Sequence, residues 1–287
     1  MGTENQSAFQ SEILSLISVS TGWLPRLEER PYYDLSSALR VMMRMSEEGL
    51  ADGCEFGLLP EWDSENAPLT PCMAPTSCEK HSLEEILAAI NQAGLKVLTV
   101  HANRDVGSYL CHTEQRKQAK GVRLVEEALK FCRSLKCNIC VFHFWDPWRK
   151  TFDAANLYNV YQSVKKSYPD IHLSIENIPT IMKGKSPFSI MDNYDWWTLD
   201  LKWASMFGEF EQFLEQSERL DNIHIQGGYQ NSGLVSSSGK LDYDAALETL
   251  LNGGYSGPFT VELEGMATHA DISICLRSLK DAISRNL

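Results

Sequence analysis

Short apolar runs alternate with longer, mixed segments along nearly the whole chain of 287 residues. Each run ends at a polar or turn-forming residue, and a short apolar run bounded in this way is typical of a buried strand. The runs predict strands at residues 13–19, 53–58, 96–100, 139–142, 173–176, 198–200, 223–225 and 258–263.

The segments between these runs repeat apolar residues near the helical period, which predicts amphipathic helices. Ser82 followed by Glu85 has the pattern of a capping box, and Gly94 stands where it can end the same helix. The expected helices lie at residues 34–49, 82–94, 114–135, 153–168, 207–220, 241–251 and 272–283.

Strands and helices alternate throughout, without a long linker or a low-complexity tract. This alternation, in a chain close to the roughly 250 residues typical of the fold, predicts a single-domain α/β protein with a (β/α)8 TIM barrel. The domain is expected to span residues 1–287, with residues 1–12 as a flexible N-terminal tail. The alternative is a doubly wound open sheet, but no glycine-rich phosphate turn follows the first expected strand.

Four consecutive strands of this scheme end in a side chain that commonly binds metal ions, namely Glu176, Asp200, His224 and Glu262. A carboxylate at the end of a buried strand is costly unless a cation or hydrogen-bond donors meet it there. In a (β/α)8 barrel the carboxyl ends of the strands converge, so these side chains are expected to surround one point. Three carboxylates and one imidazole suit one divalent ion: Mn(II), Mg(II), Co(II) or Zn(II).

The net charge limits the kinds of partner that the protein is expected to bind, and the cysteines indicate its cellular compartment. The formal net charge of −12, with a pI near 5.1, disfavours binding to the phosphate backbone of nucleic acids. No run approaches the about 20 apolar residues of a membrane span, and the polar N-terminus lacks a secretory pattern. Of eight cysteines only Cys137 and Cys140 have metal-like spacing, and we expect buried reduced thiols in a cytoplasmic protein.

Several sequence pieces, taken in order, carry a family resemblance. The chain resembles the xylose isomerase-like TIM barrel superfamily, which groups sugar and sugar-phosphate isomerases and epimerases with family 2 AP endonucleases. The matching pieces are Leu98-Thr99-Val100-His101, the strand before His143, Ser174-Ile175-Glu176-Asn177, Thr198-Leu199-Asp200, Asn222-Ile223-His224-Ile225, the segment from Gly254 to Glu262, and the early Gly53-Cys54-Glu55-Phe56.

The resemblance implies a function and a role for the strand-end residues. In the ketose 3-epimerase branch, a Glu, Asp, His and Glu at matching strand ends bind one Mn-type ion, which implies Glu176, Asp200, His224 and Glu262 as ligands. The two glutamates also act there as the acid and base, so Glu176 and Glu262 are expected to be catalytic. The implied activity is a divalent-metal-dependent sugar, sugar-phosphate or polyol isomerase or epimerase that transfers protons through an enediolate, with Mn(II) favoured.

Two departures from the family pattern leave alternatives open. Trp203 stands where the superfamily often has a histidine after the aspartate, and no second acid follows His224 closely in the sequence. The first departure puts the usual epimerase substrate contacts in doubt, and the second argues against a three-zinc site. The alternatives are an AP endonuclease-like phosphodiesterase acting on abasic DNA, and a lyase, dehydratase or non-catalytic descendant of the same barrel.

Further polar and aromatic residues near the strand ends are candidates for binding a small sugar-like substrate. His101 and His143 end two other strands and are expected to orient the substrate. Aromatic rings stack on sugars, and a lysine can meet an anionic group, although aromatics at such positions also pack barrel rims. These candidates are Trp23, Trp145, Trp203 and Lys202. We expect no membrane partner, and a homo-oligomer remains open.

Overall fold

A closed barrel of parallel strands forms the centre of the molecule. The computed structural model describes residues 16–65, 68–69, 78–226, 229–230, 233–234, 242–262 and 269–286. Among these residues eight strands close in the order β1-β10-β7-β6-β5-β4-β3-β2, so the prediction of a (β/α)8 barrel is confirmed. The strands are β1 (Ile17–Ser20), β2 (Gly53–Gly57), β3 (Val97–His101), β4 (Ile139–Phe142), β5 (His172–Glu176), β6 (Trp196–Asp200), β7 (Leu220–Gln226) and β10 (Phe259–Glu262).

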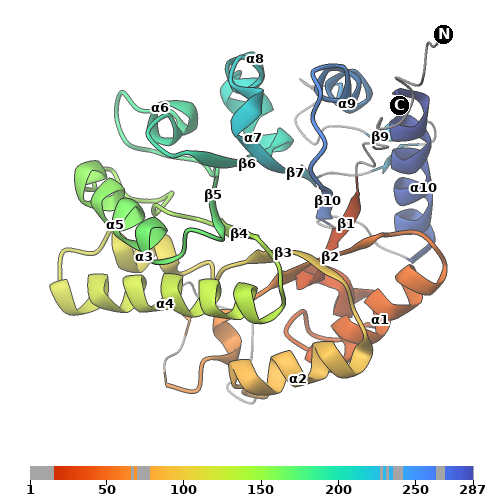
Figure 1. Cartoon of the computed structure of the whole chain (residues 1–287), viewed down its shortest axis with the longest axis horizontal. Coiled ribbons are helices and arrows are strands. Elements are labelled where there is room, and N and C mark those ends of the chain that lie inside the picture. The colour runs from red at the N-terminus through yellow and green to blue at the C-terminus, as the bar shows by residue number, and fades with distance from the viewer. Residues whose placement is uncertain are drawn as a thin grey trace, which may run out of the picture.

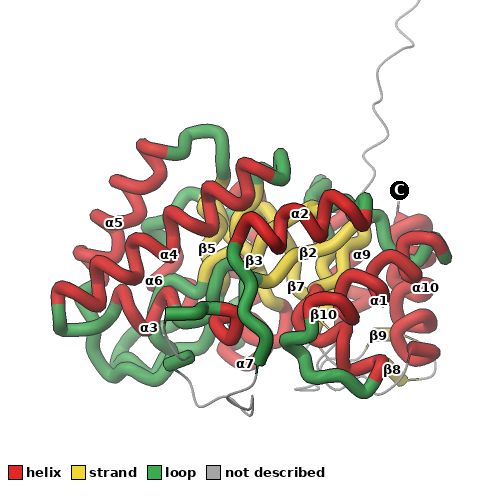
Figure 2. Tube along the Cα trace, turned by 90° about the horizontal axis from the view of Figure 1, so that it is seen from below, coloured by secondary structure: helices red, strands yellow, loops and turns green. Residues whose placement is uncertain are grey.

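Helices surround the barrel on its outer side (Figures 1 and 2). Short 3-10 helices η1 (Thr21–Glu28), η2 (Pro60–Trp62) and η3 (Ser217–Arg219) and a small ribbon of β8 (Tyr229–Gln230) and β9 (Gly233–Leu234) lie in the connections. The α-helices are α1 (Leu35–Glu47), α2 (Leu83–Ala93), α3 (Val106–Leu110), α4 (Gln115–Ser134), α5 (Ala154–Ser167), α6 (Pro187–Met191), α7 (Leu201–Phe207), α8 (Phe210–Leu214), α9 (Tyr243–Asn252) and α10 (His269–Asn286).

Local sequence signals account for the ends of α2. The side chain of Ser82 accepts a hydrogen bond from the backbone of Glu85, whose carboxylate accepts one from the backbone of Ser82. Gly94 follows the helix in a left-handed conformation with φ of 64°, which glycine adopts without a steric penalty. The expected capping box and glycine stop are both confirmed.

The region after β6 differs from the expected helix at residues 207–220. Helix α7 begins immediately after Asp200, whose Oδ1 accepts a hydrogen bond from the backbone N of Trp203 at 3.0 Å. Gly208, with φ of 68°, ends α7, and the expected helix is replaced by α8 and η3. The prediction was wrong because the aspartate caps a helix at once. Strand β1 begins at Ile17, and the expected tail at residues 1–12 lies outside the described residues.

The barrel has an apolar outer layer and a polar lumen. Side chains alternate along each strand, so that Cys54 and Phe56 pack under the helices while Glu55 points the other way. Asn222 Nδ2 on β7 donates to Glu55 Oε2 on β2 at 3.1 Å, although β1 and β10 separate these strands in the barrel order. This bond therefore crosses the lumen. Thr260 Oγ1 donates to Asn222 Oδ1 at 2.8 Å, which extends the polar network.

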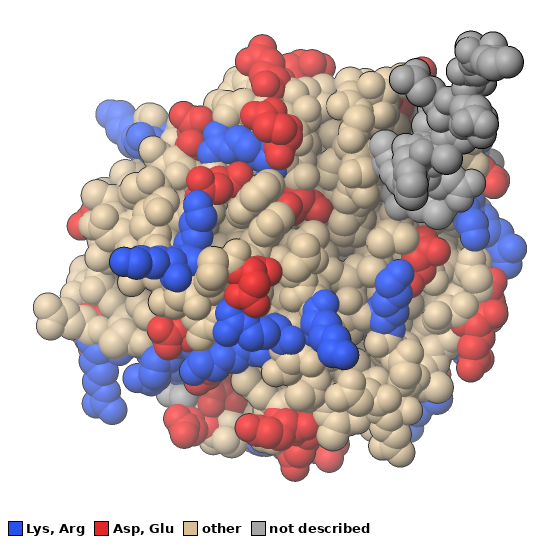
Figure 3. All heavy atoms as spheres, in the orientation of Figure 1, with Lys and Arg blue, Asp and Glu red and all other residues tan. Residues whose placement is uncertain are grey.

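The cysteines, the helices and the charged surface can be compared with what the sequence predicted. Cys137 and Cys140 are buried, free thiols. Within the described residues, none of the helices combines the length and apolar character needed to cross a membrane. On the face seen in Figure 3, lysine and arginine side chains are interspersed with aspartate and glutamate side chains.

Candidate functional site

The predicted ligand residues meet at the carboxyl end of the barrel, around the imidazole of His224. Its Nδ1 lies 3.5 Å from Oε1 of Glu176 and 3.7 Å from Oε1 of Glu262. Asp200 is the direct neighbour of His224 across β6 and β7. One ligand atom from each of Glu176, Asp200 and His224 lies within 4.8 Å of the others. We refer to Glu176, Asp200, His224 and Glu262 as the ligand centre.

Two atoms of the ligand centre are buried without hydrogen bonds. In the described part of the chain, Asp200 Oδ2 and His224 Nδ1 have no hydrogen-bond partner, and both side chains are fully buried. Such an uncompensated buried atom costs about 1–3 kcal/mol, and more when it carries charge. Oxygens of Glu176 and Glu262 approach the same nitrogen of His224, and Asp200 lies close to Glu176 and His224. Three carboxylates and one imidazole form a donor set that suits a hard divalent cation. The residues present therefore fit such an ion.

Glu55 holds His224 in the orientation that a metal ligand needs. His224 Nε2 lies 2.9 Å from Glu55 Oε2, so the opposite ring nitrogen faces the ligand centre. The same carboxylate oxygen accepts hydrogen bonds from Thr99 Oγ1 at 3.0 Å and from Asn222 Nδ2. A carboxylate behind a ligating histidine fixes its ring and raises its basicity.

The charges of the ligand centre are not balanced by the protein alone. Burial raises the pKa of Asp200, and the carboxylates of Glu176 and Glu262 raise it further, to well above its usual range. Burial also raises the pKa of Glu262; His224 opposes this, but Glu176 and Glu55 leave it raised. For His224, burial lowers the pKa, and Glu55, Glu262 and Glu176 outweigh burial and raise it well above its usual range. Burial and mutual repulsion thus oppose the simultaneous ionisation of these carboxylates, a penalty that a bound cation would relieve.

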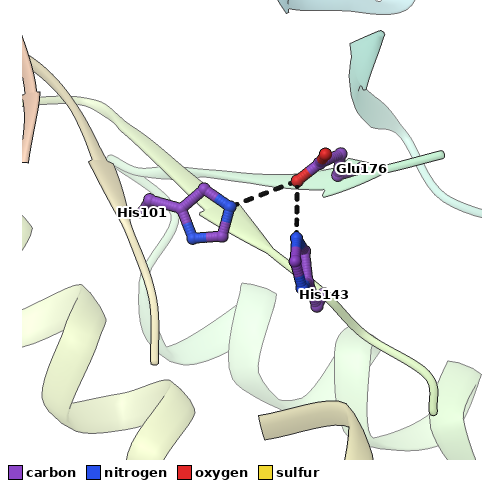
Figure 4. A group of neighbouring side chains, drawn as sticks. All are labelled: His101, His143 and Glu176. Atoms are coloured by element: carbon purple, nitrogen blue, oxygen red, sulfur yellow. Dashed lines mark hydrogen bonds and ion pairs between the residues drawn. The ribbon is translucent and has the colours of Figure 1, made fainter. Parts of the chain in front are cut away.

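A second group of side chains shares Glu176 with the ligand centre. His143 Nε2 lies 2.9 Å and His101 Nε2 lies 3.2 Å from Oε2 of Glu176, and both rings point toward this oxygen (Figure 4). His101 Nδ1 lies 2.9 Å from the carbonyl oxygen of Ala102. Burial raises the pKa of Glu176, but the charges of His143 and His224 and the hydrogen bonds from His101 and His143 outweigh burial and hold the pKa well below its usual range.

Comparison with known proteins identifies the family. The sequence profile of the xylose isomerase-like TIM barrel family matches residues 51–281. The chain belongs to this family. A search of curated proteins finds no match.

Several solved structures share the fold of this chain at low sequence identity. A D-tagatose 3-epimerase-like protein is 17% identical with a TM-score of 0.62, covering 94% of this chain and 98% of that chain. An L-ribulose 3-epimerase is 13% identical with a TM-score of 0.65, covering 95% and 96%. A D-allulose 3-epimerase from Methylomonas sp., in complex with D-allulose, is 15% identical with a TM-score of 0.65, covering 96% and 98%.

The expected substrate-binding aromatics of this family member lie in different environments. Trp23, in η1 after β1, is 39% exposed. Trp203 is partly buried in the first turn of α7. Trp145 is fully buried, and its indole Nε1 donates to the carbonyl oxygen of Pro179 at 3.0 Å, so this ring packs under the loop after β5 and is not brought into the ligand centre.

Lys202 contacts a side chain of the neighbouring strand β7. Its Nζ donates to Gln226 Oε1 at 2.9 Å and lies 4.5 Å from the centre of the Trp203 ring. Gln226 Nε2 donates in turn to Glu262 Oε2. The predicted cation for an anionic substrate group is therefore connected to a member of the ligand centre.

Sequence reasoning gave no role to three residues that support the ligand centre: Glu55, Asn177 and Gln226. Asn177 is fully buried, and its side chain accepts from the backbone N of Asp200 at 2.6 Å and donates to the backbone O of Asp200 at 3.0 Å. These bonds hold the ends of β5 and β6 together. Asn177 directly follows Glu176, and Gln226 follows His224 by two residues, so nearness in the sequence was an available signal for these two. Glu55 lies on a strand far from the other residues in the sequence and carried no such signal.

Proposed function

We propose that this protein is a divalent-metal-dependent sugar isomerase or epimerase that transfers protons between carboxylates and substrate through an enediolate. The observation that carries the proposal is the approach of two glutamates to one point from separate strands. Oε1 of Glu176 on β5 and Oε1 of Glu262 on β10 lie 3.5 and 3.7 Å from the same nitrogen of His224. Strands β6 and β7 stand between their strands in the barrel, so the carboxylates reach the centre from different sides.

The two carboxylates suit proton removal and return at a carbon beside a carbonyl group. Glu176, whose pKa is held well below its usual range, is the ionised member of the pair at neutral pH, as the proton-accepting group must be. Glu262, whose pKa is raised, is the better proton donor of the pair. Environments that move two carboxyl pKa values apart are typical of acid and base partners. Removal on one face and return on the other inverts the carbon, which is epimerisation.

Glu176, Asp200, His224 and Glu262 would hold the cation, with Mn(II) favoured over Mg(II), Co(II) and Zn(II). A bound divalent ion supplies electrostatic stabilisation of negative charge on the substrate oxygens. His101 and His143, which contact Glu176, orient that carboxylate. Because both ring nitrogens of His101 face protein oxygens, His143 is the candidate of the two to contact a sugar hydroxyl. The neighbouring solved structures support a sugar as substrate, since those compared above are named as 3-epimerases of L-ribulose and D-allulose or as D-tagatose 3-epimerase-like.

Solvent labelling tests the proposal. The protein loaded with Mn(II) is incubated in D2O with D-allulose, D-tagatose and L-ribulose, free and phosphorylated, and products are analysed by NMR. We expect an isomeric or epimeric product carrying deuterium at the carbon beside the carbonyl. A product without solvent deuterium would exclude this proton transfer, and the absence of product and label from the metal-loaded protein across the panel would contradict the proposal.

A second candidate function, phosphodiester cleavage at abasic sites, is favoured by one observation. His101, His143 and Glu176 place ligand atoms within 4.8 Å of one another, which gives a second group suited to a metal ion beside the ligand centre. Elemental analysis and incubation with an abasic duplex test this candidate. More than one ion per chain together with strand cleavage would favour it over sugar chemistry.

A further inference from the structure

A chain of hydrogen bonds leads away from the ligand centre on the side of Glu262. Oε1 of Glu262 faces His224, whereas Oε2 accepts a hydrogen bond from the side-chain amide of Gln226. The other end of that amide, Oε1 of Gln226, accepts from the ammonium of Lys202 at 2.9 Å. Three side chains from β10, β7 and α7 are thus joined in series.

The order of this series follows from what each group can donate and accept. A lysine ammonium only donates, and an ionised carboxylate only accepts, whereas a glutamine amide has one donating end and one accepting end. With Lys202 on one side, the amide oxygen of Gln226 must face the lysine and its NH2 must face Glu262. An amide without such a partner can turn over, and its oxygen would then repel the carboxylate.

The backbone around Gln226 is also fixed. Its side chain is buried, and its carbonyl oxygen accepts a hydrogen bond from Tyr243 Oη at 2.6 Å. Lys202 lies in the first turn of α7, the helix capped by Asp200. Asp200 directly precedes this turn, and Lys202 within the turn is connected to Glu262 through Gln226. The first turn of α7 is therefore linked to two members of the ligand centre.

We propose that Lys202 and Gln226 are positioning residues for Glu262. Lys202 sets the direction of the Gln226 amide, the amide holds Oε2 of Glu262, and Oε1 is thereby directed to the ligand centre. This assignment replaces a role for Lys202 in binding an anionic group of the substrate. It rests on the proposed function for its catalytic meaning, whereas the positioning itself is a property of the protein without substrate.

The first test needs neither metal nor activity. The side-chain NH2 signal of Gln226 is identified by NMR as the one lost in Gln226→Met, and its hydrogen exchange is compared in the wild type, Lys202→Met and Lys202→Arg. We expect slow exchange in the wild type, loss of protection in Lys202→Met, and recovery in Lys202→Arg, which still donates. Lys150→Met, which removes an exposed lysine after β4, is the matched control. Equal protection in Lys202→Met and the wild type overturns the proposal.

The second test measures the consequence for Glu262. We expect Lys202→Met and Gln226→Met to weaken Mn(II) binding by about 10- to 100-fold, the usual cost of losing a residue that orients a metal ligand. With an active sugar, kcat should fall while KM changes little. A raised KM confined to phosphorylated sugars would instead assign Lys202 to the substrate and overturn the proposal. If the wild type binds no Mn(II), the proposed function fails, and amide exchange still decides the positioning role.

Discussion

The two glutamates of the ligand centre are held by partners of opposite character. Oε2 of Glu176 meets the imidazoles of His101 and His143, and its side chain is 2% exposed. Oε2 of Glu262 meets the neutral amide of Gln226, and its side chain is 15% exposed. The pKa of Glu176 is held well below its usual range, whereas that of Glu262 is raised. One carboxylate is therefore kept ionised and the other is kept nearer to protonation.

This difference would suit two carboxylates at one barrel end to the two tasks that we propose for them. Both lie at strand ends, and both approach His224 with Oε1. What separates them is the set of partners on the far oxygen, because imidazoles that can carry charge stabilise a carboxylate more than an amide does. In the proposed mechanism, the partners on the far oxygens of Glu176 and Glu262 set the division of roles between them.

The largest expected effect comes from replacing Glu176. Glu176→Gln removes a ligand and leaves His101 and His143 without their anion, so we expect Mn(II) binding to fall below detection and solvent-label exchange to fall by about 10³-fold or more. Elemental analysis and deuterium incorporation measure both. The matched variant is Glu262→Gln, which should lose about 10²-fold or more in label exchange while keeping measurable Mn(II) binding. Equal losses of metal in the two variants would contradict the division of roles.

A smaller effect is expected on removing one imidazole partner. His143→Gln should weaken Mn(II) binding and label exchange by about 10- to 100-fold, because Glu176 loses one of the two donors that orient it. The double variant with Glu176→Gln should be no worse than Glu176→Gln alone, since the two residues act as a unit. Additive losses of binding in calorimetric titrations would show that His143 acts separately from Glu176.

The free energy of unfolding of the metal-free protein should also depend on pH, because His101 contacts Glu176. Burial lowers the pKa of His101, but the hydrogen bond to Glu176 and the charges of Glu55 and Glu176 outweigh burial and raise it to about 9. A histidine in the unfolded protein has a pKa of about 6.5. The stabilisation of the folded protein by charged His101 is therefore fully present below that pH and is lost as the pH rises through about 9.

Urea unfolding of EDTA-treated wild type and His101→Gln between pH 6 and pH 10 measures this dependence. The advantage of the wild type should shrink by on the order of 2 kcal/mol over that interval. Lys202→Met, on the Glu262 side, is the control and should follow the wild-type slope up to pH 9. A constant difference between wild type and His101→Gln would show that His101 is not charged in the folded protein.

The smallest expected effect concerns the ring beside Lys202. Trp203→Phe shortens the aromatic face under the ammonium, which lies 4.5 Å from the ring centre, and should cost about 0.5–1 kcal/mol of stability. Label exchange should change by only a fewfold, because the hydrogen bond from Lys202 to Gln226 remains. Thermal unfolding and the labelling assay check this. A loss as large as that of Lys202→Met would mean that the indole, rather than Gln226, holds the lysine.

The barrel and the meeting of the four strand-end residues followed from local pattern. Strands that end at Glu176, Asp200 and Glu262, and at Gln226 two residues after His224, place these side chains near the carboxyl end of a parallel barrel whatever the loops do. The expected helix at residues 207–220 failed because Asp200 caps α7 immediately and Gly208 stops it. Both signals, an aspartate at a strand end and a glycine eight residues later, are present in the sequence.

The partners of the ligands could not be read from the sequence. Glu55 reaches His224 across 169 positions of chain and across the lumen, and Gln226 reaches Glu262 between neighbouring strands. Such contacts depend on the closure of the barrel and on which face each strand residue takes. The burial of Trp145 depends likewise on the loop after β5, whose carbonyl at Pro179 accepts its indole proton.

The polar lumen separates chemistry from framework. Hydroxyl, amide and charged side chains lie along the barrel axis. The apolar side chains that pack the strands against the helices, such as Cys54 and Phe56, form an outer layer. Substitutions in the outer apolar layer and substitutions on the lumen side should therefore combine with near-additive free energies, because the two sets of side chains point to opposite faces of the strands. The stability of the barrel and the chemistry at its axis can therefore be altered separately on the same strands.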